Sequence, residues 1–294
     1  MRLRSVSDEA DRANIDQESD EHVVTGEMLV TMGEIRADEL DQVSRRQAET
    51  GERFGEAAVA LGLIDETAVA RAVERQQNFH VLSPDDERVD KLVVAAFYPT
   101  DPLAQAARRL RSVISATTRA DGEPLRLLML LAVNTRAEAA LVAANLAVAC
   151  AQTGYRTLLV DANLDAPVQH DLFRVSNRSG LSVLLARGDA GDAIQSTAIN
   201  RLSVLPAGPA VRNYGELLDR ARLYERLREF TDHYDIVLVD VSHDDPTIAV
   251  AAAEGADGAM IVVRRDDSSM HLLKTLIEEL GRRGAPVLGT VLTN

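Results

Sequence analysis

The stretch LLMLLAVNTRAEAALVAANLA, residues 127–147, decides the fold. It opens with a continuous apolar run of strand length, residues 127–133, and closes with residues 142–147, which are typical of a buried helix. A strand that turns directly into a buried helix begins a βαβ unit, and in nucleotide-binding ATPases this turn carries a phosphate loop. The turn between the two runs is NTRAEAAL, residues 134–141.

This turn does not have the residue types of a working phosphate loop at the required positions. Such a loop uses glycines to turn backbone N–H groups toward phosphate, a lysine as a point charge, and a Ser or Thr hydroxyl on Mg²⁺. None of these residues stands in the required place in residues 134–141. The sequence therefore predicts a nucleotide-binding fold that is kept for binding or regulation.

The chain from residue 126 onward alternates apolar runs with amphipathic helices, which predicts a doubly wound α/β fold with a mostly parallel sheet of the P-loop NTPase type. Such sheets bind ligands at the carboxyl ends of their strands, where Asn134, Asp161 and Asp240 fall. The predicted strands are 127–133, 157–160, 203–206, 236–240, 259–263 and 287–292.

Composition restricts the classes of partner. The chain has 294 residues and a formal net charge of −14, which argues against nucleic-acid binding because phosphate contacts need a basic surface. Its single cysteine, Cys150, lies in an apolar helical stretch and is predicted to be a core residue in a reducing cytosol. No run is long enough to span a membrane, and the first residues do not form a signal peptide. We expect a cytoplasmic protein without direct membrane insertion.

The N-terminal part contains an internal repeat with an offset of 29 residues. Each copy predicts a short helix (28–32 and 57–61), a glycine that ends it, and a second helix. The predicted organisation is an acidic tail (1–22), a small all-α domain (23–82), a linker (83–101) and the α/β domain (102–294). The repeat rests on the identical pairs Gly26/Gly55, Glu27/Glu56, Val30/Val59, Gly33/Gly62, Ile35/Ile64, Arg46/Arg75 and Gln47/Gln76.

The repeat resembles the MshEN-type N-terminal domain of type II secretion and type IV pilus ATPases, some of which bind cyclic di-GMP. The second copy keeps the arginine of the family motif, whereas the first has Val24-Thr25 in place of Arg-Leu. The resemblance implies cyclic di-GMP as a candidate ligand, and a docking module without ligand is the alternative. The residues implied for the ligand are Gly26, Gly33, Gln47, Arg53, Gly55, Gly62 and Gln76.

The α/β part resembles the cytoplasmic domain of bacterial tyrosine kinases (BY-kinases) of polysaccharide export, which are relatives of the MinD/ParA ATPases. Four stretches in the family's order carry this resemblance: VDANLDAP at 160–167, LPAGP at 205–209, YDIVLVD at 234–240 and ADG at 256–258. Active relatives use the acids at Asp161 and Asp240 around Mg²⁺. The family's helix motif E-x-x-R-x-x-R, which builds kinase rings, stands here as Gln105, Arg108 and Arg111, with glutamine in place of glutamate. The resemblance thus also implies a candidate homo-oligomer, with a weakened motif.

Departures from the family pattern cluster at the positions that carry the family's catalytic residues. In this register Arg136 and Glu138 replace loop glycines, Ala139 replaces the lysine, and Ala140-Leu141 replace the Ser/Thr pair. Asn163 and Asp165 also differ from the family's residues, and Val241-Ser242-His243 stands in place of T-P-P. We therefore expect a pseudo-kinase rather than an enzyme, with no catalytic residue, no metal and no ATP or Mg²⁺ as cofactor. A degenerate nucleotide site is expected at Arg136, Glu138, Ala139, Ala140, Asp161 and Asp240.

The expected function is regulatory. The resemblance implies a partner of an inner-membrane polysaccharide co-polymerase, or chain-length regulator, in exopolysaccharide biosynthesis, which would recruit the protein to the membrane. One alternative is an active tyrosine autokinase or ATPase with an unconventional phosphate loop, and another is a MinD/ParA-like positioning protein of a secretion or pilus system. We also expect Arg136 to pair with Asp161 or Asp240, because the loop places a cation beside two acids.

Overall fold

A computed structural model describes residues 29–30, 35–65, 68–69, 81–188, 191–211, 223–243, 245–265 and 267–293. The chain divides into two compact units, residues 1–79 and 80–294. Each unit has a core of its own. The segment predicted as an acidic tail lies outside the described residues.

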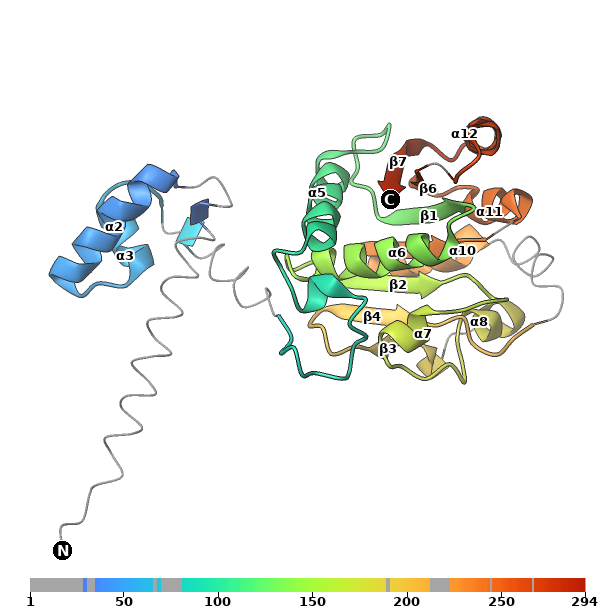
Figure 1. The fold of residues 1–294 in the computed structure, drawn as a ribbon, viewed down its shortest axis with the longest axis horizontal. Coiled ribbons are helices and arrows are strands. Elements are labelled where there is room, and N and C mark those ends of the chain that lie inside the picture. The colour runs from blue at the N-terminus through green and yellow to red at the C-terminus, as the bar shows by residue number, and fades with distance from the viewer. Residues whose placement is uncertain are drawn as a thin grey trace, which may run out of the picture. The chain divides into compact units, whose positions relative to one another are not determined.

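The first unit is helical, with α2 (Ala37–Thr50) and α3 (Phe54–Ala60) as its described helices (Figure 1). Residues 29–30 and 68–69 are also helical, and a shift of 29 places them at 58–59 in α3 and at 39–40 in α2. The described parts of the two copies thus have helices at the same repeat positions. Helix α3 begins earlier than the predicted residue 57, because the Glu56 carboxylate accepts the backbone N–H of Arg53 at 3.1 Å and caps the first turn.

The second unit is a seven-stranded sheet in the order β3-β4-β2-β5-β1-β6-β7. All neighbouring strands are parallel except β3 and β4. All six predicted strands are confirmed, and β3 was missed because it is very short and has no apolar run. In chain order the elements are η1 (Val94–Ala96), α5 (Pro102–Ala116), β1 (Leu127–Val133), α6 (Arg136–Ala151), β2 (Thr157–Asp161), α7 (Gln169–Leu172), α8 (Leu181–Arg187), η2 (Gly191–Ala193), β3 (Gln195–Ser196), β4 (Leu202–Leu205), α10 (Leu223–Arg228), η3 (Glu229–Asp232), β5 (Ile236–Val241), α11 (Pro246–Ala253), β6 (Gly258–Arg264), α12 (Met270–Arg282) and β7 (Val287–Thr293).

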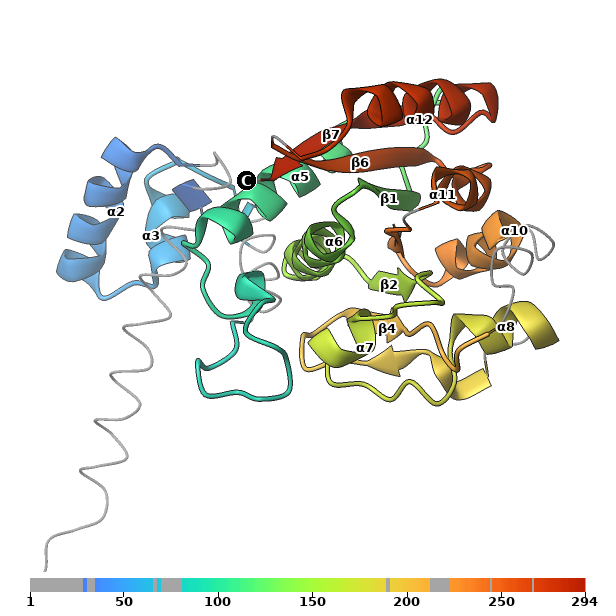
Figure 2. The same cartoon turned by 45° about the vertical axis from the view of Figure 1, so that its right-hand side comes forward.

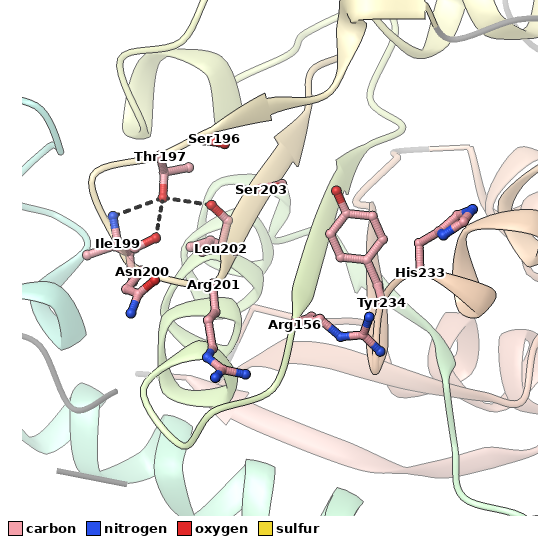
Figure 3. Close-up of a pocket in the computed structure, with 10 residues that line it drawn as sticks. All are labelled: Arg156, Ser196, Thr197, Ile199, Asn200, Arg201, Leu202, Ser203, His233 and Tyr234. Carbon is pink, nitrogen blue, oxygen red and sulfur yellow. Dashed lines mark hydrogen bonds between the residues drawn. The ribbon is translucent and has the colours of Figure 1, made fainter. Parts of the chain in front are cut away.

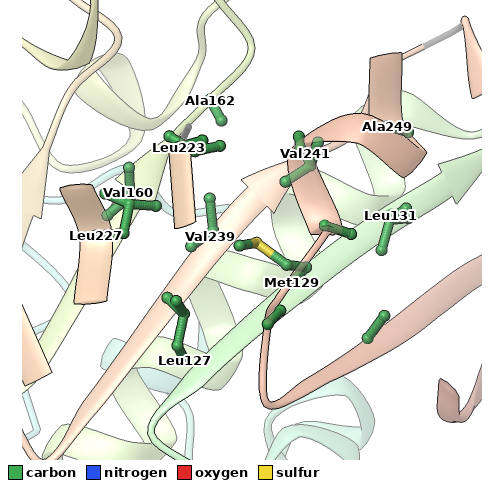
Figure 4. Close-up of a cluster of buried hydrophobic side chains, with 14 of the residues drawn as sticks. Leu127, Met129, Leu131, Val160, Ala162, Leu223, Leu227, Val239, Val241 and Ala249 are labelled. Atoms are coloured by element: carbon green, nitrogen blue, oxygen red, sulfur yellow. The ribbon is translucent and has the colours of Figure 1, made fainter. Parts of the chain in front are cut away.

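Helices cover both faces of this sheet, with α5 and α6 on one face and α8, α10, α11 and α12 on the other (Figure 2). Successive side chains of a strand point to opposite faces, so β1 supplies Leu128 and Leu130 to one core and Leu127, Met129 and Leu131 to the other. Figure 4 shows the second of these clusters. Burial on both faces explains why the central strands read as continuous apolar runs.

The segment 83–101, predicted as a linker, belongs instead to the second unit. Val93 and Ala96 are fully buried in the core around α6. The side chain of Asn145, on α6, accepts the backbone N–H of Ala95 at 2.8 Å and donates to the carbonyl oxygen of Leu92 at 3.3 Å. Because α6 is buried on nearly all sides, its outer face needs a cover, and this segment together with α5 provides it.

Candidate functional site

The connection between β1 and α6 consists of Asn134 and Thr135. Asn134 has a φ of 56°, a left-handed conformation that asparagine tolerates better than most residues. The Thr135 hydroxyl donates to the Glu138 carboxylate at 2.7 Å. The strand thus enters the helix through a short turn that is fixed by side chains of the chain itself.

Asp161 and Asp240 lie side by side at the carboxyl ends of β2 and β5, paired in register and fully buried. Asp161 accepts the backbone N–H groups of Asn163, Val168 and Gln169 at 2.9 to 3.1 Å. Asp240 accepts the Gln169 side-chain amide at 2.7 Å and both the backbone N–H and the hydroxyl of Ser242. Loop hydrogen bonds therefore satisfy both acids.

This pair has unusual proton affinity. Burial raises the pKa of Asp161 to about 7, with a further upward contribution from the adjacent Asp240 carboxylate, against the opposing effect of the backbone amides. Burial also raises the pKa of Asp240, against the hydrogen bonds from Ser242 and Gln169. Two carboxylates side by side in a dry environment favour the retention of a proton.

Arg136 pairs with an acid other than the two expected. Its guanidinium contacts the Asp165 carboxylate at 3.2 Å, and the His243 Nε2 lies 3.7 Å from the same oxygen. The hypothesis that Arg136 pairs with Asp161 or Asp240 is therefore wrong. A guanidinium beside the buried pair would lose its water, whereas Arg136 and Asp165 both keep contact with solvent. His243 is buried, and its Nδ1 accepts the backbone N–H of Asp245 at 2.8 Å.

A second ion pair joins the start of α6 to the end of β6. The Arg264 guanidinium donates to the Glu138 carboxylate at 2.8 Å and also contacts Asp267. Arg264 and the Thr135 hydroxyl hold the pKa of Glu138 below its usual value, the hydroxyl contributing more. Negative charge in the first turn of a helix is favourable, so Glu138 lies where a ligand anion would otherwise interact with the helix dipole. Ala139 and Ala140, which replace the lysine and the hydroxyl residue, are buried.

The strand ends therefore bring together most of the predicted site residues. Arg136 and Glu138 are each paired with an opposite charge, whereas Asp161 and Asp240 are held by neutral donors. Gln169 and Ser242 were missed by sequence reasoning, although Ser242 stands at a position where the family motif changes. No cluster of His, Cys, Asp and Glu suited to a metal ion occurs among the described residues. No helix in that part of the chain has the length and apolarity of a membrane span.

A hollow of about 380 Å³ lies at the opposite end of the sheet, before β2, β4 and β5 (Figure 3). Its arginines already hold local structure, because Arg156 pairs with Asp235 at 2.7 Å and Arg201 donates to the carbonyl oxygen of Gly154 at 2.9 Å. We assign this hollow no ligand. Its lining residues are Arg156, Ser196, Thr197, Ile199, Asn200, Arg201, Leu202, Ser203, His233 and Tyr234.

In the helical unit, the glycines that the structure describes have structural reasons of their own. A Cβ on Gly55 would lie 2.7 Å from the Val69 side chain, so α3 needs a glycine where the second copy's next helix packs. Gly62 has a φ of 69° in the turn after α3, as the predicted helix-ending glycine requires. Arg53 is exposed and Gln47 is half-buried. Gly26, Gly33 and Gln76 lie outside the described residues, so the cyclic di-GMP site stays a prediction.

Comparisons with known proteins bear on the second unit. Residues 139–283 match a family model described as "AAA domain". The chain is 29% identical over 196 residues to the "Putative tyrosine-protein kinase CapB" of Staphylococcus aureus, covering 66% of this chain and 85% of CapB. The crystal structure of the chimerical protein CapA2B2 superposes with a TM-score of 0.61 at 31% identity, covering 75% of this chain and 96% of that one.

The second unit belongs to the BY-kinase family of P-loop domains. A longer relative is the "Tyrosine-protein kinase wzc" of Salmonella typhimurium, 31% identical over 69% of this chain, and the match spans only 28% of its length. The predicted fold class and the BY-kinase resemblance are confirmed. The MshEN resemblance stays a prediction.

The expectation that this chain is not an enzyme is contradicted. Relatives that match most of the BY-kinase domain are named tyrosine-protein kinases, and these names point to an enzyme. The expectation rested on departures from the family pattern in the phosphate loop, at Asn163 and Asp165, and at residues 241–243. It gave little weight to the buried carboxylate pair, Asp161 and Asp240, at the carboxyl ends of β2 and β5.

Proposed function

We propose that this protein is a BY-kinase-type component of exopolysaccharide biosynthesis that works with an inner-membrane polysaccharide co-polymerase. The observation that carries the proposal is the family's P-loop sheet with Asp161 and Asp240 paired at its carboxyl edge. The pathway and the kind of partner are inferred from the motifs that this chain shares with the family. Recruitment by that partner would bring the protein to the inner membrane.

The test is genetic and biochemical. Deleting the gene should lower the amount or the chain length of exported polysaccharide, and the full chain should co-purify with the co-polymerase encoded in the same polysaccharide locus. Complementation with the Asp240→Asn variant, which keeps the shape of the side chain, asks whether the carboxylate pair is needed. Unchanged polysaccharide together with misplaced secretion or pilus machinery would overturn the proposal in favour of a MinD/ParA-like positioning protein.

We expect Mg²⁺·ATP to bind weakly at the strand ends. Position 139 offers no lysine, Arg136 and Arg264 are already paired with carboxylates, and two buried acids face any triphosphate. Calorimetric titration should give a Kd of about 1 mM or weaker. A Kd in the micromolar range would show that these ion pairs yield to nucleotide.

Tyrosine phosphorylation, the activity in the relatives' names, should be assayed in the same preparation with Mg²⁺·ATP. Phosphotyrosine formation that the Asp240→Asn variant abolishes would assign the chemistry to the carboxylate pair. The Asp171→Asn variant is the matched control, because the Asp171 carboxylate is exposed and contacts His170, not Asp161 or Asp240.

For the helical unit we infer cyclic di-GMP as the candidate ligand, with the second copy dominant. The exposed guanidinium of Arg53 at the start of α3 suits a phosphate or a guanine face, whereas the first copy has Val24 at the matching position. One lost charge-assisted contact is worth roughly 1.5 to 3 kcal/mol, so binding should be tens to hundreds of times weaker than with both arginines. Val24→Arg should tighten binding and Arg53→Ala should abolish it. If no binding occurs even with Val24→Arg, the unit is a docking module.

A further inference from the structure

We propose that Tyr155 is a phosphorylation site whose phosphate is held by Arg111 and Arg126. Tyr155 lies in the turn between α6 and β2, directly after Gly154, which has a φ of 93°. Its side chain is 37% exposed, and its hydroxyl lies 3.3 Å from the Ser115 hydroxyl on α5. An incoming kinase could therefore reach the phenol on an exposed turn.

The surroundings of this hydroxyl suit a phosphate. Tyr155 lines a hollow of about 250 Å³ together with Arg111 and Ser115 from α5 and Arg126 from the segment before β1. Arg111 and Ser115 are four residues apart and so face the same side of α5. A phosphotyrosine carries close to two negative charges and pairs strongly with guanidinium groups. Asp235 also lines the hollow, but its carboxylate is paired with Arg156 at 2.7 Å. Arg126 donates one N–H to the Thr231 carbonyl oxygen and Arg111 one to the Ser112 hydroxyl, each at 3.0 Å, so the phosphate would use other N–H groups of the two guanidiniums, each of which has five.

The other described tyrosines lack this combination of exposure and basic surroundings. Tyr98 is 43% exposed, but it lines neither the hollow beside Tyr155 nor the hollow before β2, β4 and β5. Tyr224 packs beneath Gly255 and beside Arg228, and Tyr234 packs against the core. Tyr155 combines an exposed side chain with a hollow to which two other segments contribute arginines.

The geometry requires a second molecule as the kinase. Tyr155 lies two residues before β2, whereas Asp161 lies at the carboxyl end of that strand, roughly 20 Å away along extended chain. The step is a transfer from ATP: the Tyr155 oxygen bonds to the γ-phosphorus, the bond from that phosphorus to the β,γ-bridging oxygen breaks, ADP leaves, and the phenolic proton passes to solvent. The kinase would be a BY-kinase, and in this respect the inference rests on the proposed function.

Phosphorylation should fasten three segments together. The phosphate would join the turn after α6 to Arg111 on α5 and to Arg126 before β1. The melting temperature of the second unit should rise by about 2 °C at low ionic strength. The rise should vanish at about 1 M salt, where charges are screened within about 3 Å.

One experiment tests the basic pocket without any kinase. Full-length protein carrying phosphotyrosine at position 155, introduced by codon reassignment, is compared with unmodified protein by thermal melting at low and high salt. We expect a rise that Arg111→Gln together with Arg126→Gln abolishes, while phosphotyrosine at position 98 gives none. A fall, no change, or the same rise at position 98 would overturn the proposal.

A second experiment tests the acceptor. The unmodified chain is incubated with Mg²⁺·ATP and the kinase domain of Escherichia coli ETK, and the phosphopeptides are mapped by mass spectrometry. Tyr155 should be labelled before Tyr98, and Tyr155→Phe should remove the label; labelling of Tyr98 alone, or none, would overturn the proposal. Both readouts are independent of polysaccharide export, so failure of the proposed function would be seen separately.

Discussion

Asp161 and Asp240 show how one residue pair supports both a structural and a chemical interpretation. Their positions after two buried strands were evident from sequence, because apolar runs ended by an acid mark the carboxyl edge of a parallel sheet. Their hydrogen-bond partners were not evident, because Gln169 and Ser242 reach them through loops without periodic pattern. The partner of Arg136 was also not evident from sequence. Its long side chain reaches several acids, and it pairs with the one that lets both charges keep contact with water.

The raised pKa of this pair predicts a specific dependence of stability on pH. In the unfolded chain both acids release their protons near pH 4, whereas burial keeps Asp161 protonated to about pH 7. The folded state therefore binds more protons between these values, and this stabilising contribution is lost as pH rises from about 4 through 7.

The Asp240→Asn variant should remove most of this loss of stability with rising pH. We expect its free energy of unfolding at pH 8 to exceed that of the wild type by a few kcal/mol, because one buried charge is gone. Urea denaturation at pH 5 and pH 8 measures the difference. The control is Asp171→Asn, which removes an exposed acid; equal pH dependence in all three proteins would contradict the pairing.

At the scale of elements, the motif residue Asp257 turns out to anchor the amino end of β1. Its buried carboxylate accepts the backbone N–H groups of Arg126 and Leu127 at 2.8 and 2.9 Å and pairs with Arg228 at 2.6 Å. Six of the seven strands of the sheet were predictable, because each is largely apolar, whereas the short polar β3 was not. The segment 83–101 was not, because its Pro and Asp residues are typical of loops whether or not the intervening apolar side chains are buried.

Asp257→Ala should destabilise the second unit by about 3 kcal/mol, since it leaves two backbone N–H groups and a guanidinium without their acceptor. Asp235→Ala is the matched control, because Asp235 also pairs with an arginine, Arg156, but at a more exposed position. The loss of stability caused by Asp235→Ala should be much smaller, as for surface ion pairs generally. Chemical denaturation of both variants measures the two values, and equal losses would argue against an anchoring role for Asp257.

At the scale of the whole molecule, the two units have separate cores of very different size. The helical core contains Leu29, Ile35, Val43, Phe54, Ala57 and Ala58, whereas the sheet carries a large core on each face. Small domains bury a smaller fraction of their surface and are correspondingly less stable. We therefore expect calorimetry of the full chain to show two transitions, the helical unit melting first.

Two substitutions assign these transitions. Gly55→Ala places a Cβ 2.7 Å from the Val69 side chain, so the close approach of α3 to that residue must loosen. The first transition should fall by about 5 °C or more, as a cost of about 1 kcal/mol implies for a unit of this size, while the second stays in place. Asp257→Ala should lower the second transition and leave the first in place, because the partners of Asp257 all lie in the sheet unit. If either substitution moved both transitions together, the units would unfold as one cooperative body, and a ligand bound to the helical unit would then also stabilise the BY-kinase domain.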